Sequence, residues 1–126
     1  MAGERVLVVE DNEKNMKLFH DVLEATGYTP LKASSGEEAL ALAGENPPAL
    51  VLMDIQLPDI DGTETLRRLR EDERTAHIPV LALTAQAMEG DHERFLAAGF
   101  DGYLSKPVDV PELMATVRRY CDKGTE

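Results

Sequence analysis

The sequence has few of the features that would indicate a secreted, metal-cluster or membrane protein. Cys121 is the only cysteine among 126 residues, so neither an internal disulfide nor a cysteine-based zinc cluster can form. No apolar run approaches the ~20 residues of a membrane-spanning helix. No signal-peptide segment follows Met1. We therefore expect a single domain over residues 1–126 that is cytoplasmic and not inserted in a membrane.

The sequence is also poor in basic residues. It has 13 lysines and arginines against 24 acidic residues, which gives a formal net charge of −11. Direct binding to nucleic acid requires a basic patch, so this function is disfavoured. The longest mixed-charge run, Arg67–Arg74, is interpreted as a solvated helix face.

Short apolar runs alternate with helical patterns along the chain. The predicted elements are strands at residues 5–9, 28–33, 49–53, 80–83 and 103–104, and helices beginning at about residues 12, 35, 61, 88 and 109. Capping-box pairs support three of the helix starts: Ser35 with Glu38, Asp61 with Glu64, and Asp109 with Glu112. Five strand–helix units in a row predict a doubly wound α/β domain with a five-stranded parallel sheet.

Four of the five predicted strands end abruptly in reactive polar groups. The set comprises Glu10 and Asp11 after the first strand, Asp54 after the third, Thr84 after the fourth and Lys106 after the fifth. Open α/β sheets place their ligand sites at the carboxyl ends of strands. Acids, a hydroxyl and an amine at this edge predict a site for a phosphoryl group and Mg²⁺.

The chemistry explains why these residue types belong together. A carboxylate accepts a phosphoryl group poorly because two anions must approach each other, and Mg²⁺ relieves this by binding oxygens of both. The acids Glu10, Asp11 and Asp54 can supply such a cage, and without metal they are expected to raise one another's pKa. Lys106 and Thr84 can then contact phosphoryl oxygens, so that transfer requires mainly alignment and charge neutralisation.

Four segments together resemble the receiver domain of two-component response regulators over essentially the whole chain. They are Val9-Glu10-Asp11-Asn12, Leu52-Met53-Asp54-Ile55-Gln56-Leu57-Pro58, Leu83-Thr84-Ala85 and Ser105-Lys106-Pro107. The resemblance implies a flavodoxin-like (CheY-like) fold, a phosphoacceptor role for Asp54 and a Mg²⁺ cofactor. It further implies the following roles: Asp11 as a direct metal ligand, Glu10 acting mostly through water, the Gln56 backbone carbonyl as a ligand, Thr84 and Lys106 as phosphoryl contacts, and a cis Lys106-Pro107 bond.

The resemblance also concerns the output of such a domain. Tyr103 occupies the family's aromatic switch position, where the ring turns inward as Thr84 moves. This changes the face formed by the fourth helix, fifth strand and fifth helix, through which a downstream protein or a second copy of the chain is expected to bind on phosphorylation. Histidine kinases or histidine phosphotransfer proteins are the expected donors. Gln56 and Gln86 occupy positions that tune the phosphoryl lifetime in this family.

Finer features are similar to two groups of receivers, single-domain regulators of the DivK kind and receivers fused to hybrid histidine kinases. A start just before the first strand and an end just after the last helix favour a stand-alone regulator, with an excised hybrid-kinase receiver as the alternative. Two other classes stay open. A phosphohydrolase would carry a second Asp where Gln56 stands. A degenerate interaction scaffold would have lost the acids, Thr84 and Lys106, which are all present.

Overall fold

The computed structural model describes residues 3–85 and 91–122 and contains, in these ranges, five strands alternating with five helices. The strands are β1 (Arg5–Val9), β2 (Thr29–Ala33), β3 (Leu50–Asp54), β4 (Val80–Thr84) and β5 (Gly102–Ser105). The helices are α1 (Glu13–Ala25), α2 (Gly36–Glu45), α3 (Gly62–Glu71), α4 (Asp91–Ala98) and α5 (Val110–Asp122). Gln86 and the predicted start of the fourth helix at about residue 88 lie outside the described residues.

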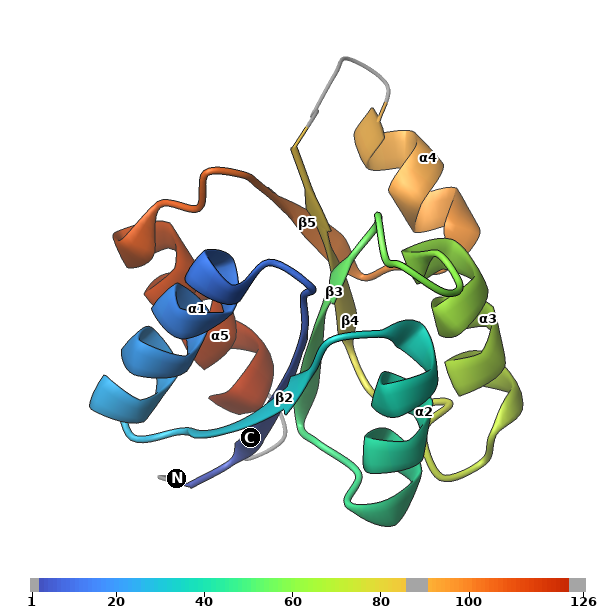
Figure 1. Cartoon of the computed structure of the whole chain (residues 1–126), viewed down its shortest axis with the longest axis horizontal. Coiled ribbons are helices and arrows are strands. Elements are labelled where there is room, and N and C mark those ends of the chain that lie inside the picture. The colour runs from blue at the N-terminus through green and yellow to red at the C-terminus, as the bar shows by residue number, and fades with distance from the viewer. Residues whose placement is uncertain (1–2, 86–90, 123–126) are drawn as a thin grey trace.

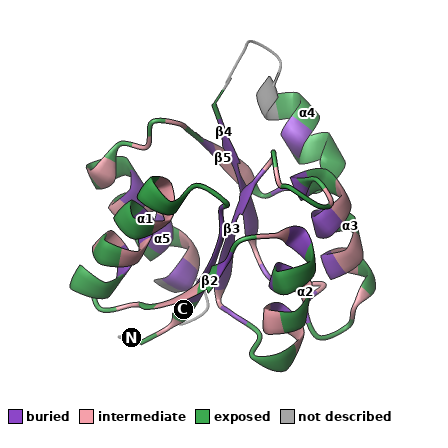
Figure 2. Ribbon diagram, viewed as in Figure 1, coloured by how far each residue is buried: buried purple, intermediate pink, exposed green. Residues whose placement is uncertain are grey.

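All five strands belong to one parallel sheet in the order β2-β1-β3-β4-β5. The predicted doubly wound α/β fold is therefore confirmed. Figure 1 shows α1 and α5 on one side of this sheet and α2, α3 and α4 on the other. The central strands have helices over both faces, so almost all of their residues are buried, as the purple strands in Figure 2 show.

Alternation along each strand divides the core into two layers. On the α1 and α5 side, Val8 and Leu52 pack with Phe19 and Leu113. On the other side, Met53 packs with helix residues that include Leu66 and Phe95. Cys121 lies in the first layer and is buried.

All three predicted helix caps are present, including Asp109 Oδ2, which accepts from the Glu112 N–H at 3.1 Å, but two of the capping boxes are only half formed. Ser35 Oγ accepts a hydrogen bond from the Glu38 N–H at 3.2 Å, and Asp61 Oδ1 accepts one from the Glu64 N–H at 2.8 Å. The reciprocal bonds differ from the prediction. The Glu38 carboxylate accepts from the Ser34 N–H, and the Glu64 carboxylate pairs with Arg67 and Arg68 instead of its own cap. Nearby cationic and backbone donors compete successfully for these exposed carboxylates.

The interpretation of Arg67–Arg74 as a solvated face is wrong for Arg70. Its side chain is only 27% exposed, and its guanidinium donates hydrogen bonds to the backbone oxygens of Ile78 and Gly99 and to Asp101. Arg70 therefore ties α3 to the chain segments that enter β4 and β5. Separately, no helix in the described ranges is both long and apolar enough to span a membrane.

Candidate functional site

Strand register brings the predicted polar residues to one edge of the sheet. Val9 pairs with Met53, so Glu10 and Asp54 follow side by side. Asp54 itself pairs with Leu83, directly before Thr84. Thr84 pairs with Ser105, which places Lys106 one step further at the same edge. Parallel pairing thus converts four separate strand ends into one cluster.

Lys106 joins the acids of this cluster. Its Nζ lies 2.9 Å from Asp54 Oδ2 and 2.7 Å from Glu10 Oε1. The side chains of Glu10, Asp54 and Lys106 are 1%, 8% and 17% exposed, so these charges interact with little screening by water. Sequence reasoning had placed Lys106 against the phosphoryl group only. The contact of Lys106 with Glu10 was not predicted, because it depends on how the lysine side chain extends from the end of β5 toward the end of β1.

One carboxylate oxygen in the cluster is incompletely satisfied. Glu10 Oε1 is buried and close to Lys106 Nζ, but the contact is an ion pair without the alignment of a hydrogen bond. Oxygens of Glu10, Asp11 and Asp54 all lie within 4.8 Å of one another. Three acids facing one lysine leave an excess of negative charge. The three carboxylates and their excess negative charge therefore fit a hard divalent cation such as Mg²⁺.

The pKa values in the cluster follow from burial and pairing. Burial raises the pKa of Glu10 above its ordinary value, and nearby Asp54 adds to the rise, while Lys106 and the Asn12 N–H oppose it. Burial by itself would lower the pKa of Lys106, but its pairing with Glu10 and Asp54 outweighs that effect and the pKa is raised. The lysine is thus held charged between the two acids.

Backbone contacts fix the phosphoacceptor candidate and the loop after it. Asp54 Oδ1 accepts a hydrogen bond from the Gln56 N–H at 2.9 Å. Gly62 N–H donates to the Ile55 oxygen at 2.9 Å, which closes the loop between β3 and α3. A Cβ on Gly62 would lie 2.5 Å from the Asp54 backbone oxygen, so a glycine is required by this close approach.

The acids, Thr84 and Lys106 line a cleft of about 500 Å³ at the carboxyl edge of the sheet. Ala85 and Arg94 also line it, and Arg94 is a residue that sequence reasoning did not select. The Arg94 guanidinium stacks over the Phe95 ring at 5.1 Å. Arg94 reaches the cleft because the fold places α4 beside the end of β4, and no local pattern in the sequence indicates this.

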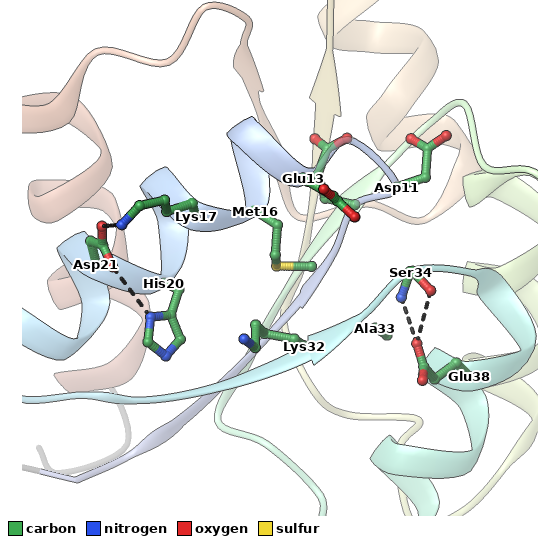
Figure 3. A pocket seen from close by; sticks show the side chains of 11 residues that line it. Asp11, Glu13, Met16, Lys17, His20, Asp21, Lys32, Ala33, Ser34 and Glu38 are labelled. Atoms are coloured by element: carbon green, nitrogen blue, oxygen red, sulfur yellow. Dashed lines mark hydrogen bonds and ion pairs between the residues drawn. The ribbon is translucent and has the colours of Figure 1, made fainter.

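A neighbouring groove of about 580 Å³ begins at Glu10 and Asp11 and continues between α1 and β2. Figure 3 shows Met16 of α1 and Lys32 of β2 in this groove, with the Lys17–Asp21 pair at one end and the Ser34–Glu38 contact at the other. Neither Thr84 nor Lys106 reaches it. We therefore assign the chemistry to the smaller cleft.

Of the remaining predicted site residues, Thr84 lines this smaller cleft, whereas Tyr103 and Pro107 do not. Thr84 is 8% exposed, and its backbone oxygen accepts a hydrogen bond from the Lys106 N–H at 2.8 Å. The Lys106-Pro107 peptide bond is cis. Tyr103 is half-buried on β5, and its ring centroid lies 5.7 Å from that of Phe95 on α4. The aromatic candidate for the switch therefore contacts the helix that it is expected to affect.

Comparison with known proteins identifies the family to which the chain belongs. A family model described as response regulator receiver domain matches residues 6–118. The chain belongs to the response regulator receiver family. It is 52% identical over 115 residues to the polar-differentiation response regulator DivK of Brucella ovis, covering 91% of this chain and 94% of that protein. The DivK protein of Brucella anthropi is 50% identical over 115 residues.

Solved receiver structures agree with the fold. The receiver domain of a sensor histidine kinase from Pseudomonas aeruginosa, solved with a magnesium ion in its active-site cleft, is 36% identical with a TM-score of 0.87. The alignment covers 95% of this chain and 98% of that one. The chemotaxis protein CheY4 of Vibrio cholerae is 28% identical with a TM-score of 0.87, covering 94% of this chain and 99% of that one. This receiver thus belongs to a family of signalling proteins that interact with histidine kinases or phosphotransfer proteins.

Proposed function

We propose that this receiver accepts a phosphoryl group on the Asp54 carboxylate, with Mg²⁺ held by Glu10, Asp11, Asp54 and the Gln56 backbone carbonyl. The main support for the proposal is the ion pair between Asp54 Oδ2 and Lys106 Nζ, which are 2.9 Å apart in an acid-lined cleft that is open to solvent. The magnesium ion reported in the cleft of the Pseudomonas aeruginosa receiver supports the choice of metal.

In this proposal an Asp54 carboxylate oxygen attacks the phosphorus of a phosphohistidine on the donor protein. The new O–P bond forms as the P–N bond breaks, and the bonding electrons leave with the imidazole. Bound Mg²⁺ would neutralise charge on the carboxylate and the phosphoryl oxygens. Asp54 is fixed for the attack because Gln56 N–H holds its Oδ1 at 2.9 Å. Pre-set geometry of this kind lowers the entropic part of the barrier.

Lys106 and Thr84 are the proposed phosphoryl contacts. The Lys106 ammonium already lies against Asp54, so a small movement away from Glu10 directs its N–H groups to an arriving phosphoryl oxygen. The Thr84 side chain stands at the end of the adjacent strand, where its hydroxyl can donate to a second oxygen. Ala85, which is small and exposed, leaves room for the donor protein.

The proposed output is contact with another protein or onward phosphotransfer. Tyr103 supports the α4–β5–α5 face as the surface involved, because its ring packs on Phe95 of α4 while its backbone belongs to β5. Movement of Thr84 at the end of β4 would be transmitted to this ring, since Ala82 of the same strand pairs with Tyr103. Phosphorylation then shifts the population between two arrangements of this face.

The experiment is intact-mass spectrometry after incubation with acetyl phosphate, with and without Mg²⁺. We expect one phosphoryl adduct on the wild-type chain with Mg²⁺ and none without it. Asp54→Ala should give no adduct. The control Asp21→Ala removes an exposed acid of α1 and should be phosphorylated like the wild type. An adduct on Asp54→Ala, or one independent of Mg²⁺, would contradict the proposal. Absence of turnover on a generic phosphate ester is expected for a receiver and separates it from a phosphohydrolase.

A further inference from the structure

The loop between β3 and α3 is attached to a helix that is distant in sequence. Asp59 of this loop uses both carboxylate oxygens to accept backbone hydrogen bonds at the start of α2. Its Oδ1 accepts from the Gly36 N–H and its Oδ2 from the Glu37 N–H, each at 2.9 Å. The two partners precede it by 23 and 22 residues. Asp59 therefore links the 55–61 loop, which contains Gln56, to the start of α2.

These contacts complete the first turn of α2. A helix begins with N–H groups that have no partner within the helix. Ser35 Oγ accepts from the Glu38 N–H at 3.2 Å, and Asp59 accepts from the two N–H groups before it. The first three donors of α2 are thus satisfied by one local cap and one remote carboxylate. The bond from Glu37 and then that from Gly36 lower the pKa of Asp59 below its ordinary value, so the carboxylate is charged near neutral pH.

Close packing holds the loop in the same position. A Cβ on Gly36 would overlap Ile60 Cγ1 and Thr65 Oγ1, so the start of α2 is in direct contact with the loop and α3. Arg68 of α3 pairs with Glu37 of α2 at 3.0 Å at the same junction. The start of α2 is therefore held to this junction by packing against Ile60 and Thr65 as well as by the Asp59 hydrogen bonds.

We propose that Asp59 is a positioning residue for the metal site, because it anchors the 55–61 loop to the start of α2 and so holds the Gln56 carbonyl beside Asp54. The inference rests on the proposed Mg²⁺ site. The Gln56 N–H already bonds Asp54 Oδ1, so a displacement of the loop moves this backbone segment relative to the carboxylate. Asp59 touches neither the acids nor the phosphoryl position, and it acts through the loop backbone.

The proposal predicts that the two residues that cap α2 differ in their effect on Mg²⁺ binding. Ser35 and Asp59 both stabilise the start of α2, but only Asp59 belongs to the loop that carries Gln56. Loss of either cap should lower the melting temperature. Only loss of Asp59 should weaken Mg²⁺ binding, because only then is the loop released.

The test measures the Mg²⁺ dissociation constant of the full chain by calorimetry, together with amide hydrogen exchange in residues 55–62 and the melting temperature without metal. For Asp59→Ala we expect the dissociation constant to rise about tenfold, the lower end of the range for residues that position metal ligands, with faster exchange in the loop. Asp59→Asn keeps one acceptor oxygen and should lie between Asp59→Ala and the wild type. Ser35→Ala is the matched control and should lower the melting temperature while leaving the dissociation constant unchanged.

The outcomes separate the inference from the function on which it rests. If Asp59→Ala and Asp59→Asn bind Mg²⁺ as tightly as the wild type while their melting temperatures fall, Asp59 is only a helix cap and the inference is overturned. If Ser35→Ala weakens Mg²⁺ binding as much as Asp59→Ala does, general loosening of α2 explains the effect and the inference is equally overturned. If the wild type itself does not bind Mg²⁺, the proposed metal site fails first.

Discussion

Replacing Lys106 by methionine should destabilise the metal-free protein strongly, although the two side chains are similar in length. Lys106 Nζ lies between Glu10 Oε1 at 2.7 Å and Asp54 Oδ2 at 2.9 Å. The substitution keeps the apolar stem and removes the cation. Glu10 and Asp54, both buried, are then left as neighbouring negative charges with no cationic partner in the contact.

The magnitude follows from the separation and the burial of the charges. At an effective dielectric constant of about 20, each contact near 2.8 Å has a Coulomb energy of about 6 kcal/mol before the cost of desolvation. Removing one partner of a buried ion pair usually destabilises a protein by about 3–5 kcal/mol. Lys106 retains 17% exposure, so we expect a loss of about 3 kcal/mol in the free energy of unfolding at pH 7.

The loss should depend on pH and on metal. The pKa of Glu10 is raised in the folded protein, so the unfolded chain ionises first and stability falls as pH rises from about its ordinary value of 4.5. Without Lys106 this pKa rises further. The difference between variant and wild type should therefore be largest near neutral pH and shrink as pH falls toward 4.5. Mg²⁺ should also reduce it, because a divalent cation replaces the missing charge and stabilises the folded state by mass action.

The assay is urea unfolding followed by far-ultraviolet circular dichroism at pH 7, in EDTA and in saturating Mg²⁺. A loss of about 3 kcal/mol moves the urea midpoint by about 2 M for a domain of this size. Lys17→Met is the matched control, because Lys17 pairs with Asp21 at the same 2.7 Å but its side chain is 76% exposed. We expect no measurable change for this control. A Lys106→Met variant as stable as Lys17→Met in EDTA, or a deficit that Mg²⁺ does not reduce, would refute the reasoning.

Two further predictions concern the packing of the loop and the output face. Gly62→Ala should destabilise the fold by about 1–3 kcal/mol, because the new Cβ would lie 2.5 Å from the Asp54 backbone oxygen. In the control Gly44→Ala the new Cβ meets only the end of the long Arg74 side chain at 2.9 Å, which can shift, so the melting temperature should not fall. Phosphorylation with acetyl phosphate and Mg²⁺ should promote binding through the α4–β5–α5 face. We expect either a higher oligomeric mass in light scattering or a higher affinity for a partner protein. Tyr103→Ala should abolish that change without preventing the phosphoryl adduct, and an unchanged mass and affinity on phosphorylating the wild type would count against this face.

The order of elements and the site edge were predictable because they depend on local patterns. Uninterrupted apolar runs such as Leu50–Met53 predict strands that are buried on both faces, and the structure confirms them. Gly27 follows the C-cap of α1 and has a φ of +93°, a conformation that glycine adopts without strain. The polar residues after four strands had to gather at one edge once the sheet was parallel. Their residue types then indicated phosphoryl and metal chemistry.

The contacts that distinguish individual side chains were not predictable in the same way. The Glu10–Lys106 and Asp59–Gly36 contacts join residues 96 and 23 positions apart, and no periodic pattern relates them. Arg70 has the sequence context of a solvated arginine, but the fold surrounds it with backbone oxygens that need a donor. Which of several exposed acids binds which donor depends on their final positions in space.

The sequence by itself determined the fold class and the group of polar residues at the strand ends, because hydrophobic periodicity and residue type act over short stretches of chain. Four short motifs carried the resemblance to the receiver family. Tertiary structure alone decided that Lys106 bridges two acids, that Arg94 borders the cleft and that Asp59 connects the 55–61 loop to α2. Hydrogen bonds and ion pairs act over about 3 Å. They are therefore settled only when packing has placed distant segments within that distance.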